Sequence, residues 1–265
     1  IGTTGAGEPT RIPRDLVQWA ISAAPSHIQI YDRRGRPCFA LKGDGAQETV
    51  FGIGCTNLHY QDPCDDTIGP FHRRHVSAAV GLGHRLNDID LISTPGILQD
   101  LPPDRADLYG VLEMTANTSK PLVMLISDWD AFNPALDLCE HLHGDLSAQP
   151  FIIPYVNPVT PLILNSATTL KMEASIRRGL PFIFSNYSMS GATCPITPAG
   201  TLALLTAELL AGLVYSQLVK EGSPVILGSC PAAFDMKQAG SFYSPQSLLL
   251  NLACAEIVTS YKIPH

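Results

Sequence analysis

The feature that most constrains the fold is a proline at the start of each of four short apolar segments. The prolines are Pro121, Pro150, Pro181 and Pro224, and each is followed by a run such as Leu-Val-Met-Leu-Ile or Val-Ile-Leu. Proline is tolerated at the first residue of a strand, and an apolar run without strict alternation is typical of a strand covered on both faces. These segments predict neighbouring strands of a parallel sheet, and residues 89–94 predict an earlier one.

Helix signals lie between the predicted strands. Asn133-Pro134, Thr197-Pro198 and Ser244-Pro245 each place an N-cap residue before a proline at the first helical position. Gly179 and Gly222 stand where glycine commonly ends a helix. Strand and helix therefore alternate along the chain, which is the order of a repeated βα unit.

Repeated βα units predict either a doubly wound sheet or a (β/α)8 barrel. The chain has no G-x-G-x-x-G turn after an early strand and no P-loop, so we favour an α/β protein of the TIM-barrel type. We expect one domain over residues 1–265, with a lead-in at 1–48 and βα units at 49–265. The lead-in holds a predicted helix at residues 13–24 and a predicted strand at 28–32.

The length of the chain adds an expectation about the end of the barrel. Ile263-Pro264 has the form of a strand start, and the sequence stops directly after it. Eight βα units usually need about 250 residues without a lead-in. We therefore expect the barrel to be incomplete at its C-terminal end, with an open sheet edge.

Composition limits the classes of partner. With 45% hydrophobic and 15% charged residues the chain has enough apolar side chains for a large core. Its net charge is −7 and its basic residues cluster only in pairs, which argues against nucleic acid. The apolar stretch at residues 202–218 contains Glu208 and Gln217, which favours a buried helix over a membrane span. Seven scattered cysteines suggest free thiols and a cytoplasmic protein.

Candidate site residues are those that follow the apolar runs, because the active site of a (β/α)8 barrel lies at the carboxyl ends of its strands. Aromatic side chains gather there, while Asp128 brings the one carboxylate; the aromatic residues are Trp129, Phe132, Tyr155 and Tyr187. Aromatic faces bind alkylated ammonium groups. The alternative is that these rings cover the barrel core by packing.

Other polar residues give weaker signals. Cys55, His59 and Cys64 could be zinc ligands but lack a second pair at a standard spacing. Cys194 has no histidine close in sequence, which favours an inert buried thiol over a nucleophile. Glu208 is either a buried, hydrogen-bonded acid at an active site or an outer-face residue bonded to a neighbouring helix. The second is favoured because helices form the outer ring of a barrel.

Several motifs follow one another in an order that resembles one family. They are Gly191-Ala-Thr-Cys-Pro-Ile-Thr-Pro-Ala-Gly200, Ala207-Glu-Leu-Leu-Ala-Gly212, Gln217-Leu218, Gly222-Ser-Pro-Val225 and Asp235-Met236, preceded by Arg11-Ile-Pro-Arg-Asp-Leu-Val17 and Thr118-Ser-Lys-Pro121. Together they resemble the trimethylamine methyltransferase family, which includes relatives that act on quaternary amines. The resemblance implies a (β/α)8 barrel that moves a methyl group from an amine to the cobalt of a cobalamin (corrinoid) carried by a separate protein.

The resemblance also implies how the amine is activated. A leaving nitrogen must carry positive charge, and a quaternary amine already does. In the trimethylamine enzymes a pyrrolysine is thought to activate the tertiary amine, and the quaternary-amine relatives have an ordinary residue there. The corresponding position would lie shortly after residues 263–265.

We therefore predict a methyltransferase that acts on a tertiary or quaternary amine of the trimethylamine or glycine-betaine type. The predicted catalytic residues are Asn157, Asn186, Ser229 and Asp235, and the predicted substrate-binding residues are Trp129, Tyr155 and Tyr187. No metal site and no tightly bound cofactor are expected. The expected partners are a small methylated amine and a corrinoid protein, without nucleic acid or membrane, and a homo-oligomer is left open.

Two alternatives remain at this point. A truncated, non-catalytic barrel would bind a methylated ammonium ligand or the corrinoid protein without turnover. An unrelated barrel lyase or aldolase would commonly use a lysine at a strand end, and none of the predicted strand ends carries one.

Overall fold

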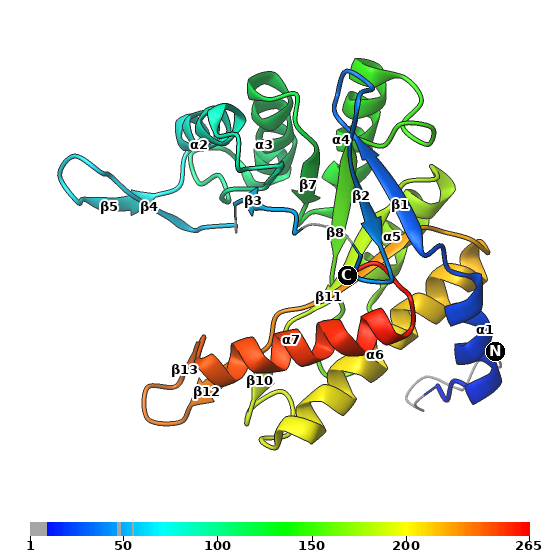
Figure 1. The fold of residues 1–265 in the computed structure, drawn as a ribbon. Helices are drawn as coiled ribbons and strands as arrows, with labels where there is room; N and C mark the ends of the chain where they lie inside the picture. The colour runs from blue at the N-terminus through cyan, green and yellow to red at the C-terminus, as the bar shows by residue number, and fades with distance from the viewer. Residues whose placement is uncertain (1–9, 47–48, 55) are drawn as a thin grey trace.

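A curled sheet of six parallel strands forms the centre of the protein, as the computed structural model shows (Figure 1). The structure describes residues 10–46, 49–54 and 56–265. Order in the sheet follows order in the chain: β3 (Gly52–Ile53), β6 (Leu91–Ser93), β7 (Leu122–Leu125), β8 (Ile152–Val156), β9 (Phe182–Asn186) and β11 (Val225–Ser229). The strands predicted after the prolines are thus confirmed.

Helices alternate with these strands and cover the outer face of the sheet (Figure 1). They are α2 (Arg73–Arg85), α3 (Pro103–Asn117), α4 (Trp129–His143), α5 (Ser166–Arg177), α6 (Pro198–Val219) and α7 (Pro245–Ser260). Successive strand residues face opposite sides. Phe182 and Phe184 of β9 therefore pack in the cluster with α6, whereas Ile153 and Ile226 point to the concave side. The α/β half-barrel is confirmed, and a closed eight-stranded barrel stays a prediction.

The predicted lead-in helix and strand are present as α1 (Arg14–Ala23) and β1 (His27–Tyr31). The strand pairs antiparallel with β2 (Pro37–Lys42) to make a hairpin. Ile30 and Leu41 of this hairpin pack against the concave face of the sheet. The Tyr31 amide donates to the carbonyl of Pro150, just before β8, with an N–O distance of 2.9 Å. The hairpin therefore covers the concave face toward the end where the strands begin, and we call it the plug.

Two of the three predicted helix starts are confirmed. The Thr197 and Ser244 side chains accept hydrogen bonds from the amides of Gly200 and Ser247 and cap α6 and α7. The start at Asn133-Pro134 is wrong, because α4 begins at Trp129 and contains Pro134. Asp128 caps that helix by accepting from the Asp130 amide. Pro134 therefore lies inside the helix, where it cannot donate a backbone hydrogen bond, and the N-cap is Asp128 rather than Asn133.

Helix α6 is long and apolar enough, by length and composition alone, to cross a membrane. In the structure it packs on β9 and β11 and contacts α1 and α7. Leu205, Leu209 and Leu213 are buried in these contacts. This packing is typical of a core helix and agrees with the prediction made from Glu208 and Gln217.

Strand β11 lies at one edge of the sheet, and the predicted strand start at Ile263-Pro264 lies beside it. The Leu227 amide donates to the Pro264 carbonyl at 2.9 Å, and residues 263–265 form no strand of their own. Besides the plug, two small sheets lie outside the main sheet among the described residues. One joins β10 (Met189–Ser190), β12 (Ala232–Asp235) and β13 (Gly240–Phe242), and the other is the hairpin of β4 (His59–Gln61) and β5 (Ile68–Pro70).

Candidate functional site

A cavity of about 240 Å³ lies where β7 and β8 end and α5 begins. Its walls include Leu125 at the end of β7 and Ser127 just after it, Tyr155 of β8 and Asn157 just after it, and Thr168 and Lys171 of α5. Tyr155 also packs with the concave-side cluster, so the cavity adjoins the interior of the half-barrel. Two of the predicted site residues, Tyr155 and Asn157, thus line one cavity.

Lys171 brings a buried ammonium group to this cavity. Its side chain reaches from α5 to the end of β7, where Nζ donates to the carbonyls of Ile126 at 2.7 Å and Ser127 at 2.8 Å. The residue is only 9% exposed. Burial lowers the pKa of Lys171, while the charges of Asp107 and Asp128 act in the opposite direction. The sequence analysis looked for a lysine only at the ends of the predicted strands, and so it missed this lysine on a helix.

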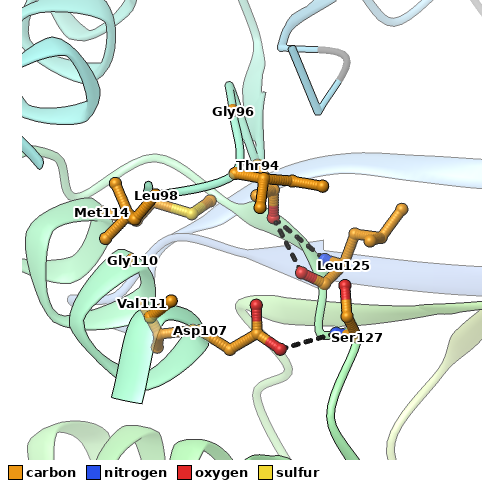
Figure 2. A pocket seen from close by; sticks show the side chains of 11 residues that line it. Thr94, Gly96, Leu98, Asp107, Gly110, Val111, Met114, Leu125 and Ser127 are labelled. Atoms are coloured by element: carbon orange, nitrogen blue, oxygen red, sulfur yellow. Dashed lines mark hydrogen bonds between the residues drawn. The ribbon is translucent and has the colours of Figure 1, made fainter. Parts of the chain in front are cut away.

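Asp107 of α3 binds the other side of the same loop. Its Oδ2 atom accepts from the amides of Ser127 at 2.7 Å and Asp128 at 2.9 Å. Figure 2 shows the bond to Ser127, together with Thr94, whose hydroxyl accepts from the Leu125 amide. In the loop after β7, backbone carbonyls therefore accept hydrogen bonds from the ammonium group of Lys171. Backbone amides of the same loop donate to the carboxylate of Asp107. We call Asp107 and Lys171 the β7 clamp.

Glu208 of α6 has a related role in the loop after β8. It is 2% exposed, and it accepts from the Leu162 amide at 2.6 Å, the Thr160 hydroxyl at 3.1 Å and the Asn186 amide at 2.9 Å. Leu162 has a φ of 61°, a region that costs energy for a branched side chain. The favoured expectation of a bond to a neighbouring helix was wrong. The helical spacing of Leu205, Glu208 and Leu209 places the carboxylate on the buried face.

The other predicted catalytic residues lie away from the cavity lining. Asn186 is fully buried and faces α6, where its amide nitrogen donates to the Leu205 carbonyl and to Glu208. Ser229 faces α7 beside the thiol of Cys254, whose pKa burial raises and the serine hydroxyl lowers in part. Asp235 lies in the small sheet and accepts from the Lys237 amide at 2.7 Å.

The remaining predicted aromatic residues have different surroundings. Trp129 is the first residue of α4 and stacks on Phe132, with ring centroids 6.1 Å apart. Both side chains pack in the apolar cluster between the sheet and the helices. Tyr187 follows β9 and is 39% exposed. The structure therefore gathers Tyr155 and Asn157, and it separates them from Trp129, which packs as the alternative interpretation expected. The functional roles of all seven residues stay predictions.

Metal-ligating side chains are scattered. In the described ranges, no three His, Cys, Asp or Glu side chains lie close enough together to hold a metal ion. His59 is in β4, Cys64 is in the following turn, and Cys55 lies outside the described residues. Cys194 is a buried free thiol next to Thr201, as expected.

Lys171, Asp107 and Glu208 are the site residues that the sequence analysis missed or misplaced. A signal for Lys171 was present: Thr168, Lys171, Met172, Ser175 and Ile176 have the spacing of one helix face, and all five are buried. A lysine within such a stripe indicates a buried ammonium group. The sequence offers no comparable signal for the loop that it binds.

Comparison with known proteins identifies the family. The family described as trimethylamine methyltransferase (MTTB) matches residues 2–265. Trimethylamine methyltransferase MttB of Desulfitobacterium hafniense is 29% identical over 96% of this chain and 51% of its own length. The protein of the same name from Methanosarcina barkeri is 27% identical over 96% and 52%.

A third relative carries another substrate in its name. Glycine betaine methyltransferase of Desulfitobacterium hafniense is 28% identical over 97% of this chain and 54% of its own length. The chain thus spans about half the length of these curated relatives. The match over nearly all of its residues confirms the predicted resemblance, and the chain belongs to the trimethylamine methyltransferase family.

Proposed function

We propose that the chain is part of an enzyme that transfers a methyl group from a tertiary or quaternary amine to the cobalamin of a separate corrinoid protein. The observation that carries this proposal is the family match over residues 2–265, with relatives named for trimethylamine and for glycine betaine. The half-barrel with its cavity at the carboxyl ends of the strands supports it, because barrel enzymes bind their substrates there. A complete (β/α)8 barrel and a cytoplasmic location belong to the same proposal.

The chemistry sets the demands on the site. Reduced corrinoid supplies a nucleophilic cobalt, and the protein must hold a positively charged nitrogen in line with it. An aromatic face stabilises such a cation when water is excluded. We assign this role to Tyr155, with Tyr187 on the loop after β9 as a further aromatic contact, and we assign Asn157 to the polar side of the substrate.

In this proposal three of the predicted catalytic residues position other groups and do not touch the substrate. They are Asn186, Ser229 and Asp235. Asn186 donates to Glu208, and Glu208 binds the loop that continues from β8. Ser229 ends β11 next to α7. We infer that the first two keep the strand ends in place, and that Asp235 orders the turn that carries Lys237. This makes them positioning residues rather than groups that touch the substrate.

Exposed apolar side chains support a protein partner at this end of the molecule. Leu162 and Ile163 after β8 and Ile196 before α6 are 62%, 52% and 74% exposed. Exposed apolar side chains mark an interaction surface where they form a contiguous patch, and we infer that these three contribute to one. We assign this surface to the corrinoid protein.

Methyl transfer is measured directly. The complete gene product is mixed with a corrinoid protein in its cob(I)alamin state and with trimethylamine or glycine betaine, and methyl-cobalt absorbance is followed. We expect it to appear with at least one amine; no transfer from any tertiary or quaternary amine would contradict the proposal. Binding without transfer would support the alternative, a non-catalytic ammonium-binding protein.

A variant pair at one position tests the aromatic contact. Tyr155→Leu removes the ring and should raise KM for the amine roughly tenfold, since cation–π contacts in dry sites contribute about 1–2 kcal/mol. Tyr155→Phe keeps the ring face and should leave KM close to that of the parent. An equal effect of both changes would exclude the ring face as the amine contact.

A further inference from the structure

We propose that the cavity at the ends of β7 and β8 contains an anion subsite at Lys171, which takes the carboxylate of a betaine-type zwitterion. The inference that the ligand carries an ammonium group rests on the proposed function. The inference that it also carries an anionic group rests only on the surroundings of Lys171. The inference therefore narrows the substrate class from any methylated amine to one that carries a carboxylate.

The first support is a buried charge without an ion-pair partner. None of the ion pairs among the described residues includes Lys171. Its two bonds go to neutral carbonyls, of Ile126 and Ser127, and an ammonium group has a third N–H to donate. Buried charges are usually paired. An anion in the adjoining cavity would supply the missing partner.

The second support is the start of α5 in the wall of the same cavity. Asn165 caps this 12-residue helix by accepting from the Thr168 amide at 2.8 Å, and Ala167 and Thr168 line the cavity. The N-terminus of a helix carries partial positive charge and favours anions. The helix dipole and the ammonium group thus favour the same kind of ligand.

The carboxylates on the neighbouring elements do not form an ion pair with Lys171, so they do not remove the preference of this site for an anion. Asp107 of α3 is occupied by the amides of Ser127 and Asp128, and Asp128 caps α4. Both affect Lys171 through longer-range attraction. The carboxylates therefore help to keep the lysine charged, while Lys171 keeps one N–H beyond its two bonds to carbonyls.

Tyr155 supplies the second half of the specificity. It lines the same cavity, so a small zwitterion can place its carboxylate at Lys171 and its ammonium group at the ring. A volume of about 240 Å³ suits a small metabolite better than a drug-sized ligand. A cation without a carboxylate would be repelled by Lys171 and would bring no anion of its own to pair with it.

The test compares two ligands that share a trimethylammonium group. Glycine betaine carries a carboxylate where choline carries a hydroxymethyl group, and calorimetry on the complete gene product measures both affinities. We expect glycine betaine to bind about tenfold tighter, as a charge-assisted hydrogen bond implies. Equal affinities, or tighter binding of choline, would overturn the subsite.

A matched pair of lysine variants locates the effect. Lys171→Met should remove the preference for glycine betaine and leave choline binding unchanged or improved. Lys120→Met is the control, because Lys120 also donates to backbone carbonyls, those of Gly83, Leu86 and Ile89, and does not line the cavity. A preference that survives in the folded Lys171→Met protein would refute the assignment.

Acetate competition covers the case in which Lys171→Met fails to fold. In the unmodified protein, acetate should displace glycine betaine and leave choline bound, and displacement of neither would overturn the subsite. These binding measurements can be distinguished from a test of methyl transfer. A betaine preference without methyl transfer would support the subsite and contradict the enzyme, and methyl transfer without the preference would do the reverse.

Discussion

The two ends of the half-barrel are held together in different ways. Where the strands begin, the plug packs Ile30 and Leu41 on the sheet through apolar contacts. Where the strands end, Lys171, Asp107 and Glu208 reach from helices and bind the backbone of loops. One end thus consists of interlocking hydrophobic side chains, and the other holds its loops by buried charge. From this difference we expect stability to be concentrated at the first end and, under the proposed function, ligand binding at the second.

The largest effect is expected in the plug. Ile30→Ala removes three carbon atoms from a fully buried side chain and should lower the free energy of unfolding by about 3 kcal/mol. Urea denaturation measures this loss, and Ile12→Ala, at a partly exposed position, should cost less than about 1 kcal/mol. Glycine betaine affinity should stay unchanged in folded Ile30→Ala. A large loss of glycine betaine affinity in this variant would contradict the assignment of stability and ligand binding to different ends.

Glu208→Gln should have the next largest effect. The glutamine side chain keeps one oxygen acceptor, but its NH2 group replaces the other. That NH2 group then faces one of the three groups that donate to Glu208, on Leu162, Thr160 or Asn186. We expect a loss of about 2 kcal/mol in unfolding free energy, together with weaker ligand binding at the neighbouring cavity. Glu221→Gln, at an exposed position, is the control and should change neither quantity. A neutral result for Glu208→Gln would show that its three bonds do not order the loop.

The β7 clamp gives a smaller change. Asp107→Asn keeps an oxygen acceptor for the Ser127 and Asp128 amides but loses its charge, so we expect a cost of about 1 kcal/mol. It should also lower the pKa of Lys171 further, because the Asp107 charge raises that pKa. The preference for glycine betaine over choline should then disappear at a lower pH than in the parent. Asp104→Asn on the same helix, an exposed position, should leave this pH unchanged.

The smallest effect concerns pH and the plug. Burial alone would raise the pKa of Asp32 in the hairpin turn, but hydrogen bonds from Arg36 and Arg34 and the Arg36 charge outweigh it and hold the pKa below its usual value. A carboxyl group with a lowered folded-state pKa stabilises the protein above its usual pKa, and this stabilisation is lost as pH falls toward the folded-state value. Urea midpoints should therefore fall less on acidification in Asp32→Asn than in the parent. Identical pH profiles would contradict the role of this turn.

The same division explains what could be predicted from the sequence. Strands marked by proline and helix starts such as Thr197 and Ser244 depend on local signals, and these were correct. Glu208 and Lys171 act through contacts between elements that are distant in the chain, so their partners depend on packing. A period of two along β9 would have placed Asn186 on the outer face with Phe184, because alternate residues share a side.

Hydrogen–deuterium exchange with and without glycine betaine is the most direct test of the claim that the carboxyl-end rim is the binding end. We expect ligand-dependent protection in residues 125–128 and 155–171, which surround the cavity, and none in the plug strands β1 and β2. Protection of the plug with an unchanged rim, or no protection anywhere at saturating ligand, would contradict this claim.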